Sequence, residues 1–98
     1  MIIVIAKVIP KEGKEPEFIK IASDLVDITR NEEKNISYDL VSSLDDNAFL
    51  FIEKWEDMDG LNQHLNSAHF KFFDHCSKVF TEDSEITVYD SEEIHLME

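Results

Sequence analysis

Residues 49–70 read FLFIEKWEDMDGLNQHLNSAHF, and this stretch decides the arrangement of the rest of the chain. Side chains in a strand alternate between two faces, so residues 49–55 predict a strand with an aromatic face that also carries a carboxylate. That face consists of Phe49, Phe51, Glu53 and Trp55. Asp57 predicts the N-cap of a helix, because its carboxylate can accept from the free N–H groups of the first turn. The helix then brings His64 back beside Trp55.

Residues 2–9, upstream of this stretch, are rich in β-branched side chains and predict a strand that is apolar on both faces. A strand of this kind is stable only where both faces are covered. Pro16 suits the first turn of a helix, and apolar residues at helical spacing continue this helix to Ile28. The opposite face of the helix is acidic and is expected to lie in water, and residues 31–35 form a polar break after it.

Residues 36–44 alternate in polarity and predict a half-exposed strand. The acidic turn at residues 45–47 closes an antiparallel hairpin between this strand and the aromatic strand. Ser67 predicts the N-cap of a further helix, which runs to Phe80. Residues 86–89 predict a last, short strand.

The predicted order of elements is β-α-β-β-α-β, an α+β arrangement of the ferredoxin-like kind. Its four strands form an antiparallel sheet, and the helices cover one face of it. The other face also carries apolar side chains, from residues 2–9 and 49–55, which an isolated sheet would leave in contact with water. Two copies pairing through this face would cover it, so we expect a symmetric homodimer with a barrel-like core.

The chain has 98 residues, of which 43% are hydrophobic. This length predicts one domain over residues 1–98, with an acidic tail at residues 91–98. A domain this short buries only about two-thirds of the surface that its unfolded chain exposes, so a partner subunit would stabilise it. The formal net charge of −13 repels phosphate groups and anionic membrane surfaces, and it excludes nucleic acids and membranes as partners.

A single cysteine, Cys76, excludes a disulfide within the chain. It lies in a helical run of apolar residues, which predicts a buried, unreactive thiol and suits the reducing cytosol. The apolar run at residues 1–9 is interrupted by Lys7, is followed by Pro10, and is too short to span a bilayer. We therefore expect a cytoplasmic protein.

One set of spaced residues resembles the signature of the antibiotic biosynthesis monooxygenase family: Glu53-x-Trp55, His64, Ser67, His69 and Phe70. The order of elements follows that family over nearly the whole chain. The resemblance implies a dimeric α+β barrel in which each subunit encloses a mostly apolar pocket between sheet and helices. It also implies oxygenation of quinols or polycyclic phenols by O₂ as co-substrate, without a metal or flavin cofactor.

The residue types suit such a reaction. A deprotonated, electron-rich phenol can transfer an electron to O₂ and recombine with it, so the protein has to supply a base, an aromatic wall and exclusion of water. The unperturbed pKa of histidine, about 6.5, makes His64 or His69 the first candidate for the base. Glu53 could orient that imidazole, or could itself be the base if burial raised its pKa. The indole of Trp55 could stack on a planar substrate and donate its N–H to an oxygen.

The sequence thus predicts two groups of site residues. The catalytic candidates are His64, Trp55, Glu53 and His69. The candidates for substrate binding are Phe49, Phe51, Tyr38, Phe70 and Phe73. No metal site is predicted, because His64 and His69 lie five residues apart across a helix break and no cysteine or paired carboxylate completes a ligand set.

These residues also have purely structural interpretations. A tryptophan at the end of a strand is commonly a core anchor, and Glu53 could pair with a lysine at a dimer rim. His69 could serve only to pack and cap the start of its helix. Phenylalanines at helical spacing are core residues by default, and His75 and His95 belong to no motif.

Three other functions fit parts of the sequence. The first is a regulatory or binding dimer that holds a small apolar metabolite without turnover. The second is haem degradation, but haem-degrading relatives carry an asparagine at the position of Ala6, a tryptophan at His64 and a ligating histidine at Asp74. The third is isomerisation of a small phosphorylated signal metabolite, which the lack of an arginine near the motif disfavours, since the only arginine is Arg30.

Overall fold

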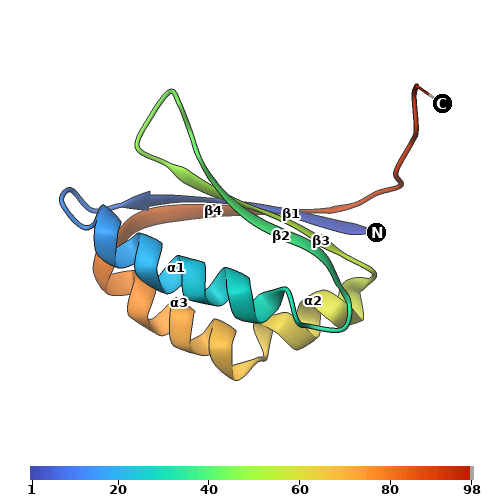
Figure 1. Ribbon diagram of the computed structural model, residues 1–98, viewed down its shortest axis with the longest axis horizontal. Helices are drawn as coiled ribbons and strands as arrows, with labels where there is room; N and C mark the ends of the chain where they lie inside the picture. The colour runs from blue at the N-terminus through green and yellow to red at the C-terminus, as the bar shows by residue number, and fades with distance from the viewer. Residues whose placement is uncertain (98) are drawn as a thin grey trace.

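The computed structural model describes residues 1–97, and Glu98 lies outside the described residues. A four-stranded antiparallel sheet carries three helices on one face (Figure 1). The chain runs through β1 (Ile2–Pro10), α1 (Glu15–Thr29), β2 (Asn35–Ser42), β3 (Phe49–Trp55), α2 (Met58–Leu65), α3 (Ala68–Phe80) and β4 (Thr81–Asp90). This confirms the predicted ferredoxin-like α+β order, with α2 and α3 together in the place of the second helix.

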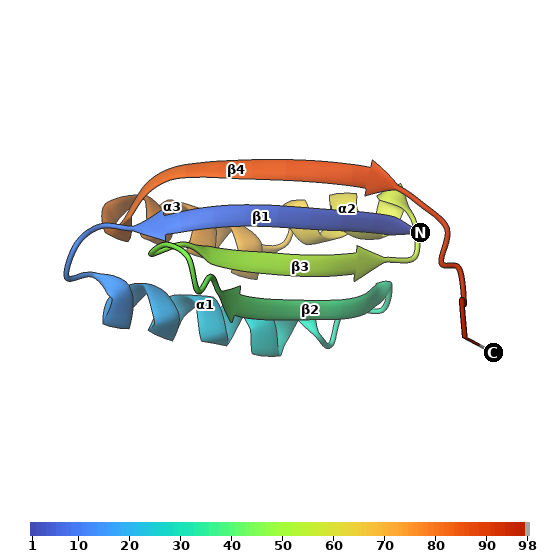
Figure 2. The same cartoon turned by 90° about the horizontal axis from the view of Figure 1, so that it is seen from above.

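The strands lie in the order β2-β3-β1-β4, which Figure 2 shows from above. β1 and β3 occupy the centre, where the most apolar strands are covered best. The register pairs Val4 of β1 with Glu53 of β3, and pairs Glu53 with Tyr38 of β2. Directly paired residues of neighbouring strands point to the same face. All three are buried, and so lie on the face that the helices cover.

The core fills the space between the sheet and the helices. Alternate residues of β1 enter it, namely Ile2, Val4, Ala6 and Val8. α1 contributes Phe18, Ala22, Leu25 and Val26. Trp55 at the end of β3 is fully buried, which confirms the aromatic face predicted for this strand.

α1 begins where the sequence predicts. Gly13 has φ of 79°, in the left-handed region that favours glycine, and so allows the tight turn between β1 and α1. Pro16 lies in the first turn of the helix, where a missing N–H costs no helical hydrogen bond.

The hairpin between β2 and β3 is confirmed, but β2 is shorter than residues 36–44. The N–H of Ser43 donates to the C=O of Ala48, and the N–H of Ala48 donates to Oδ1 of Asp46, which closes the turn. No residue of this turn has a positive φ, so it does not use the left-handed geometry that its acidic residues tolerate. Leu44 lies in the loop, fully exposed.

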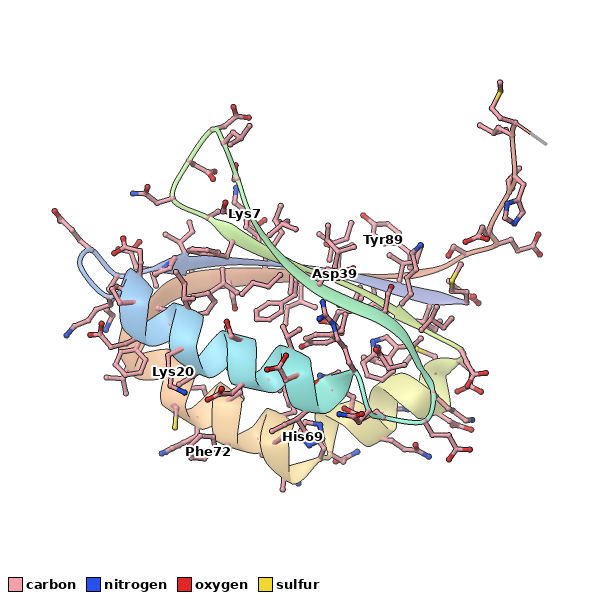
Figure 3. The ribbon with its side chains drawn as sticks, in the orientation of Figure 1. Lys7, Lys20, Asp39, His69, Phe72 and Tyr89 are labelled. Carbon is pink, nitrogen blue, oxygen red and sulfur yellow. The ribbon has the colours of Figure 1, made fainter. Side chains whose placement is uncertain are left out.

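β4 is longer than the predicted strand at residues 86–89, because it pairs with β1 along almost the whole of that strand. The backbone ladder overrides the acidic composition of its first half. Cys76 is half-buried, not buried as predicted, since α3 turns neighbouring Phe72 outward (Figure 3). Within residues 1–97, no helix has the length and apolar character needed to cross a membrane.

α2 approaches the segment after α1 closely at Gly60. A Cβ at Gly60 would lie 2.7 Å from Cβ of Lys34. Asp57 caps α2 as predicted, with Oδ1 accepting from the N–H of Gly60 at 2.9 Å and Oδ2 accepting from Nζ of Lys34 at 2.9 Å. This contact joins the helix that carries His64 to the turn that precedes β2.

Gly60→Ala is expected to lower the free energy of unfolding by about 1–2 kcal/mol, although alanine gains about 1 kcal/mol over glycine in a helix. The new Cβ meets a carbon next to the Lys34 backbone, which cannot move away as a side-chain tip can. Denaturant unfolding measures the change. Asn62→Ala, on the exposed side of the same helix, is the control and should be neutral or stabilising. Equal stabilisation by both substitutions would contradict the close approach.

Candidate active site

His64 lies buried in the last turn of α2, among aromatic side chains. The centroid of its ring is 4.9 Å from that of Trp55, 5.0 Å from that of Phe70 and 5.3 Å from that of Tyr38. The prediction that α2 returns His64 to Trp55 is therefore confirmed. A histidine in such a setting lacks water to hydrogen bond with, so its nitrogens depend on protein partners.

The carboxylate of Glu32 contacts both histidines of the predicted site. Its Oε2 lies 2.6 Å from Nδ1 of His64 and 2.7 Å from Nε2 of His69. Glu32 lies in the turn after α1, where its N–H donates to the C=O of Thr29. Sequence reasoning missed this residue, because a polar turn gives no local signal that separates Glu32 from its exposed neighbour Glu33.

A tight junction between α2 and α3 fixes the two histidines relative to each other. The hydroxyl of Ser67 donates to the C=O of His64 at 2.6 Å and accepts from the N–H of Phe70 at 3.2 Å. Ser67 is thus the N-cap of α3, as predicted. The centroids of the His64 and His69 rings are 5.9 Å apart.

The hydrogen bond to Glu32 determines which nitrogen of His64 can take up a proton. An ionised carboxylate only accepts, so Nδ1 must carry the proton and Nε2 keeps its lone pair. Nε2 lies 3.5 Å from the hydroxyl oxygen of Tyr38. The contact between His64 and Glu32 has the geometry of a base and its orienting group, an arrangement that can activate a hydroxyl group.

A cavity of about 310 Å³ lies between the sheet and the helices α2 and α3. Its buried end is polar and consists of Tyr38, Glu53 and His64. Its middle is apolar, with Val4, Ala6, Val8, Phe51 and Phe73. The other end opens beside β4, where the cavity-lining Ile86 and Val88 are 63% and 47% exposed.

Glu53 lies at the polar end and is hydrogen bonded to Trp55, whose indole N–H donates to Oε1 at 3.0 Å. Burial raises the pKa of Glu53 to about 7, and the charge of Glu32 adds to the increase, whereas the hydrogen bond from Trp55 opposes it. The carboxyl of Glu53 therefore exists in both protonation states near neutral pH. It can accept a proton or donate one.

Burial also sets the charge states of the other two polar groups. It lowers the pKa of His64, and the Glu32 carboxylate only partly offsets this effect, so the imidazole is neutral near pH 7. Burial raises the pKa of the Tyr38 hydroxyl, helped by the charges of Glu53 and Glu32, so this group stays protonated. The polar end thus presents an acceptor nitrogen, a hydroxyl donor and a carboxyl that can change its protonation.

The family model described as antibiotic biosynthesis monooxygenase matches residues 1–74. The chain belongs to the antibiotic biosynthesis monooxygenase family. The resemblance seen in the spaced residues is confirmed, and Glu32, Tyr38, Glu53, His64 and His69 all lie in the matched segment. The last part of α3 and all of β4, which form the open end of the cavity, lie beyond it.

Relatives within the antibiotic biosynthesis monooxygenase family support a monooxygenase-like function. A Bacillus subtilis (strain 168) protein named "Putative monooxygenase YcnE" is 38% identical over 74 residues, which make up 74% of this chain and 78% of the relative. The crystal structure of a conserved protein from Methanosarcina mazei Go1 matches with a TM-score of 0.89 and 30% identity, covering 93% of this chain and 92% of the other. A Deinococcus radiodurans structure named as a "putative antibiotic biosynthesis monooxygenase" matches over the full length of both chains, with a TM-score of 0.93 and 21% identity, and shows the shared fold.

Within this family fold, the cavity wall includes six of the predicted site residues: Tyr38, Phe51, Glu53, His64, Phe70 and Phe73. It does not include Phe49, Trp55 or His69. Phe49 packs on Phe18, with ring centroids 5.3 Å apart. Trp55 instead hydrogen bonds to Glu53, and His69 hydrogen bonds to Glu32. The structure therefore places Trp55 to hold Glu53, and not to stack directly on a ligand in this cavity.

The position of Glu32 corrects two sequence-based expectations, one about the residue that orients His64 and one about possible metal ligands. Glu32, and not Glu53, contacts the imidazole of His64. Sequence reasoning found no carboxylate to join the histidines, whereas one potential ligand atom each from Glu32, His64 and His69 lies within 4.8 Å of the others. Haem degradation would need a ligating histidine at the position of Asp74, which lines the cavity. The adjacent His75 could serve only as a displaced ligand, but it is exposed on α3 and is absent from the cavity wall.

Glu53 is expected to make the stability of the fold fall as pH rises. Its pKa of about 7 in the folded protein lies above the ordinary value of 4.5, so the folded state holds a proton that the unfolded state releases between these values. Glu53→Gln keeps an oxygen acceptor for Trp55 and removes the charge. We expect this variant to exceed the wild type in free energy of unfolding by at most about 3 kcal/mol at pH 8 and by little at pH 4.

Denaturant unfolding across this pH range measures the difference. Glu33→Gln, an exposed neighbour of Glu32, is the control and should follow the wild type at every pH. A stability difference for Glu53→Gln that does not change with pH would contradict a raised pKa of Glu53 in the folded protein.

Proposed function

We propose that the protein is a cofactor-independent monooxygenase that oxidises a quinol or polyphenolic aromatic substrate with O₂. The proposal is carried by one observation: Nδ1 of His64 is bound to Glu32, which leaves Nε2 as an acceptor at the polar end of a largely apolar cavity. A planar aromatic molecule can occupy the apolar middle while a phenolic hydroxyl reaches His64. Family membership and the names of relatives support the same class of reaction.

The first step is proton transfer from a phenolic hydroxyl of the substrate to Nε2 of His64. The proton stays on an imidazole whose Nδ1–H still donates to Glu32, so the new positive charge faces a carboxylate. The hydroxyl of Tyr38 donates to the developing phenolate oxygen, since Tyr38 remains protonated. The aromatic and aliphatic walls exclude water from this charge.

The phenolate then transfers one electron to O₂, and the two radicals combine to form a carbon–oxygen bond at a ring carbon that carries hydrogen. Loss of that hydrogen as a proton and cleavage of the O–O bond leave one oxygen on the substrate and release the other as water. In an anthrone the CH₂ becomes C=O, and in a quinol the ring C–H becomes C–OH while the two hydroxyls become carbonyls. Either change supplies all four electrons that reduce O₂, so the proposed reaction needs no external reductant. The carboxyl of Glu53, with a pKa of about 7, can give the departing oxygen its proton.

Oxygen consumption with anthrones and reduced naphthoquinones tests this proposal. We expect wild-type protein to exceed the uncatalysed rate with at least one of them, and His64→Ala to lower kcat by about 10²–10⁴-fold. Substrate affinity should change far less, because removal of the His64 imidazole leaves the apolar wall of the cavity in place. His75→Ala, an exposed histidine on α3, is the control and should keep wild-type activity.

The result also separates a monooxygenase from a protein that only binds its ligand. A regulatory or binding dimer would hold such molecules with equal affinity in the wild type and in the double variant His64→Ala with His69→Ala, and neither would consume oxygen. Failure of every compound to exceed the uncatalysed rate, or turnover that does not depend on His64, would overturn the proposed function.

We also propose that two chains pair through the face of the sheet that the helices leave open. Lys7 and Tyr89 project from this face, away from the helices (Figure 3). The register places Ile5 opposite Ile52 at its centre, and Ile5 is 37% exposed. Apolar side chains on an uncovered sheet face are costly in water, and a symmetric homodimer covers them on both chains.

Ile5→Lys is expected to raise the dissociation constant of the dimer at least tenfold. The lysine of each chain would lose its water in the interface, where no opposite charge is provided to replace it. Sedimentation at a series of concentrations measures this constant. Ile28→Lys is the matched control, since Ile28 is 48% exposed but lies on α1, on the helical side. Equal weakening by both substitutions, or a monomeric wild type, would contradict pairing through the sheet.

A further inference from the structure

Glu32, His64 and His69 converge from three separate elements of the fold. Glu32 comes from the turn after α1, His64 from the end of α2 and His69 from the start of α3. Their potential ligand atoms all lie within 4.8 Å of one another. We propose that this cluster binds a divalent transition-metal ion of the Zn²⁺ type, and that the bound ion switches off His64 as a base.

The donor set is one that such ions use. Two imidazole nitrogens and one carboxylate oxygen hold zinc in many open sites, where a water molecule takes the fourth position. Imidazole ligands favour Zn²⁺, Cu²⁺ and Ni²⁺ over Mg²⁺ and Ca²⁺, which prefer oxygen ligands alone. A cluster with two histidines and one glutamate is therefore selective for the first group of ions.

The present contacts are hydrogen bonds, and a metal ion requires a small rearrangement of them. Ligands about 2.1 Å from a tetrahedral ion lie about 3.4 Å from each other. The oxygen of Glu32 now lies 2.6 Å and 2.7 Å from the two nitrogens, so it has to withdraw by less than 1 Å. The two imidazole nitrogens lie within 4.8 Å of each other, so they have to approach by up to about 1.4 Å. Rotations of the Glu32 and His69 side chains produce both movements, because Glu32 lies in a turn and the side chain of His69 is 21% exposed.

The cluster is accessible from solvent without passing through the cavity. The side chains of Glu32 and His69 are 16% and 21% exposed, whereas His64 is buried behind them. His69 lies on the helical side of the molecule in Figure 3, away from the sheet. An ion therefore enters from the helical surface and meets Nδ1 of His64, the nitrogen that faces away from Tyr38.

Metal binding changes the proton on the other nitrogen of His64. In the metal-free protein Nδ1 carries the proton and Nε2 is the acceptor. An ion coordinated to Nδ1 takes that lone pair, so the proton of the neutral ring moves to Nε2. His64 then offers a donor to Tyr38 and to the cavity, where the proposed reaction needs an acceptor. The inhibitory part of this inference rests on the proposed function, whereas metal binding itself does not.

Zinc binding is tested by titration of the full chain in competition with a chromophoric chelator. The wild type is expected to bind one Zn²⁺ per chain, and Glu32→Gln and His69→Gln should each weaken affinity at least about tenfold, since even residues that only support ligands cost this much. His75→Gln, which removes an exposed histidine outside the cluster, should keep wild-type affinity. Circular dichroism and thermal unfolding check that each variant is folded.

Two spectroscopic measurements on the wild type avoid any dependence on variants. Co²⁺ should give the intense visible bands of a four-coordinate ion, where a loosely held surface ion would stay six-coordinate and pale. Nitrogen NMR of the imidazoles should show metal on Nδ1 of His64 and a proton on Nε2. Metal found on His75 or His95 alone, no stoichiometric binding, or affinity unchanged in Glu32→Gln and His69→Gln would overturn the site.

Inhibition is measured separately, as loss of oxygen consumption on adding Zn²⁺ and its recovery with a chelator. Stoichiometric zinc at His64 with full retained turnover would overturn the inhibitory switch but not the metal site. If no substrate is oxidised by the metal-free protein, the proposed function fails, and the titration and the spectra still decide whether the cluster binds metal.

Discussion

The hydrogen bonds of the Glu32 carboxylate to two imidazoles are the contact on which the site depends. One oxygen accepts from both rings, and in doing so it sets the tautomer of His64 and the orientation of His69. Without this carboxylate Nδ1 of a buried histidine would have to find another partner or remain unsatisfied. The chemistry available at the cavity therefore follows from a residue that does not itself line the cavity.

Glu32 also influences the second acidic group of the site. Glu53 lies among aromatic and aliphatic side chains, so burial is the main reason that its pKa rises to about 7, and the charge of Glu32 raises it further. The two carboxyls thus differ: Glu32 contacts both imidazoles, and Glu53 can change its protonation near neutral pH. Trp55 stabilises the ionised form of Glu53 through its indole N–H, which explains a buried tryptophan outside the cavity wall.

Two junctions of helix α2, one with the segment after α1 and one with α3, hold His64 in the position that the proposed chemistry requires. Asp57 caps α2 and contacts Lys34, and Gly60 lets α2 approach that same segment, two residues from Glu32. Ser67 then joins α2 to α3 and fixes the distance between the two histidines. The capping residues Asp57 and Ser67, which are ordinary helix signals in the sequence, therefore also determine where His64 is held.

The sequence by itself determined the family, the element order, the caps at Asp57 and Ser67, and the pairing of the aromatic strand with His64, because these follow from residue spacing and local hydrogen bonding. It also predicted six of the residues in the cavity wall. Only the tertiary structure decided that β4 extends along β1, that Trp55 hydrogen bonds to Glu53 from outside the cavity wall, and that Glu32 joins His64 to His69. The contacts of β4 and of Glu32 form between segments far apart in the chain, and the position of Trp55 relative to the cavity depends on the helices packed over its strand. A polar turn carries no pattern that tells which of its two glutamates will point inward.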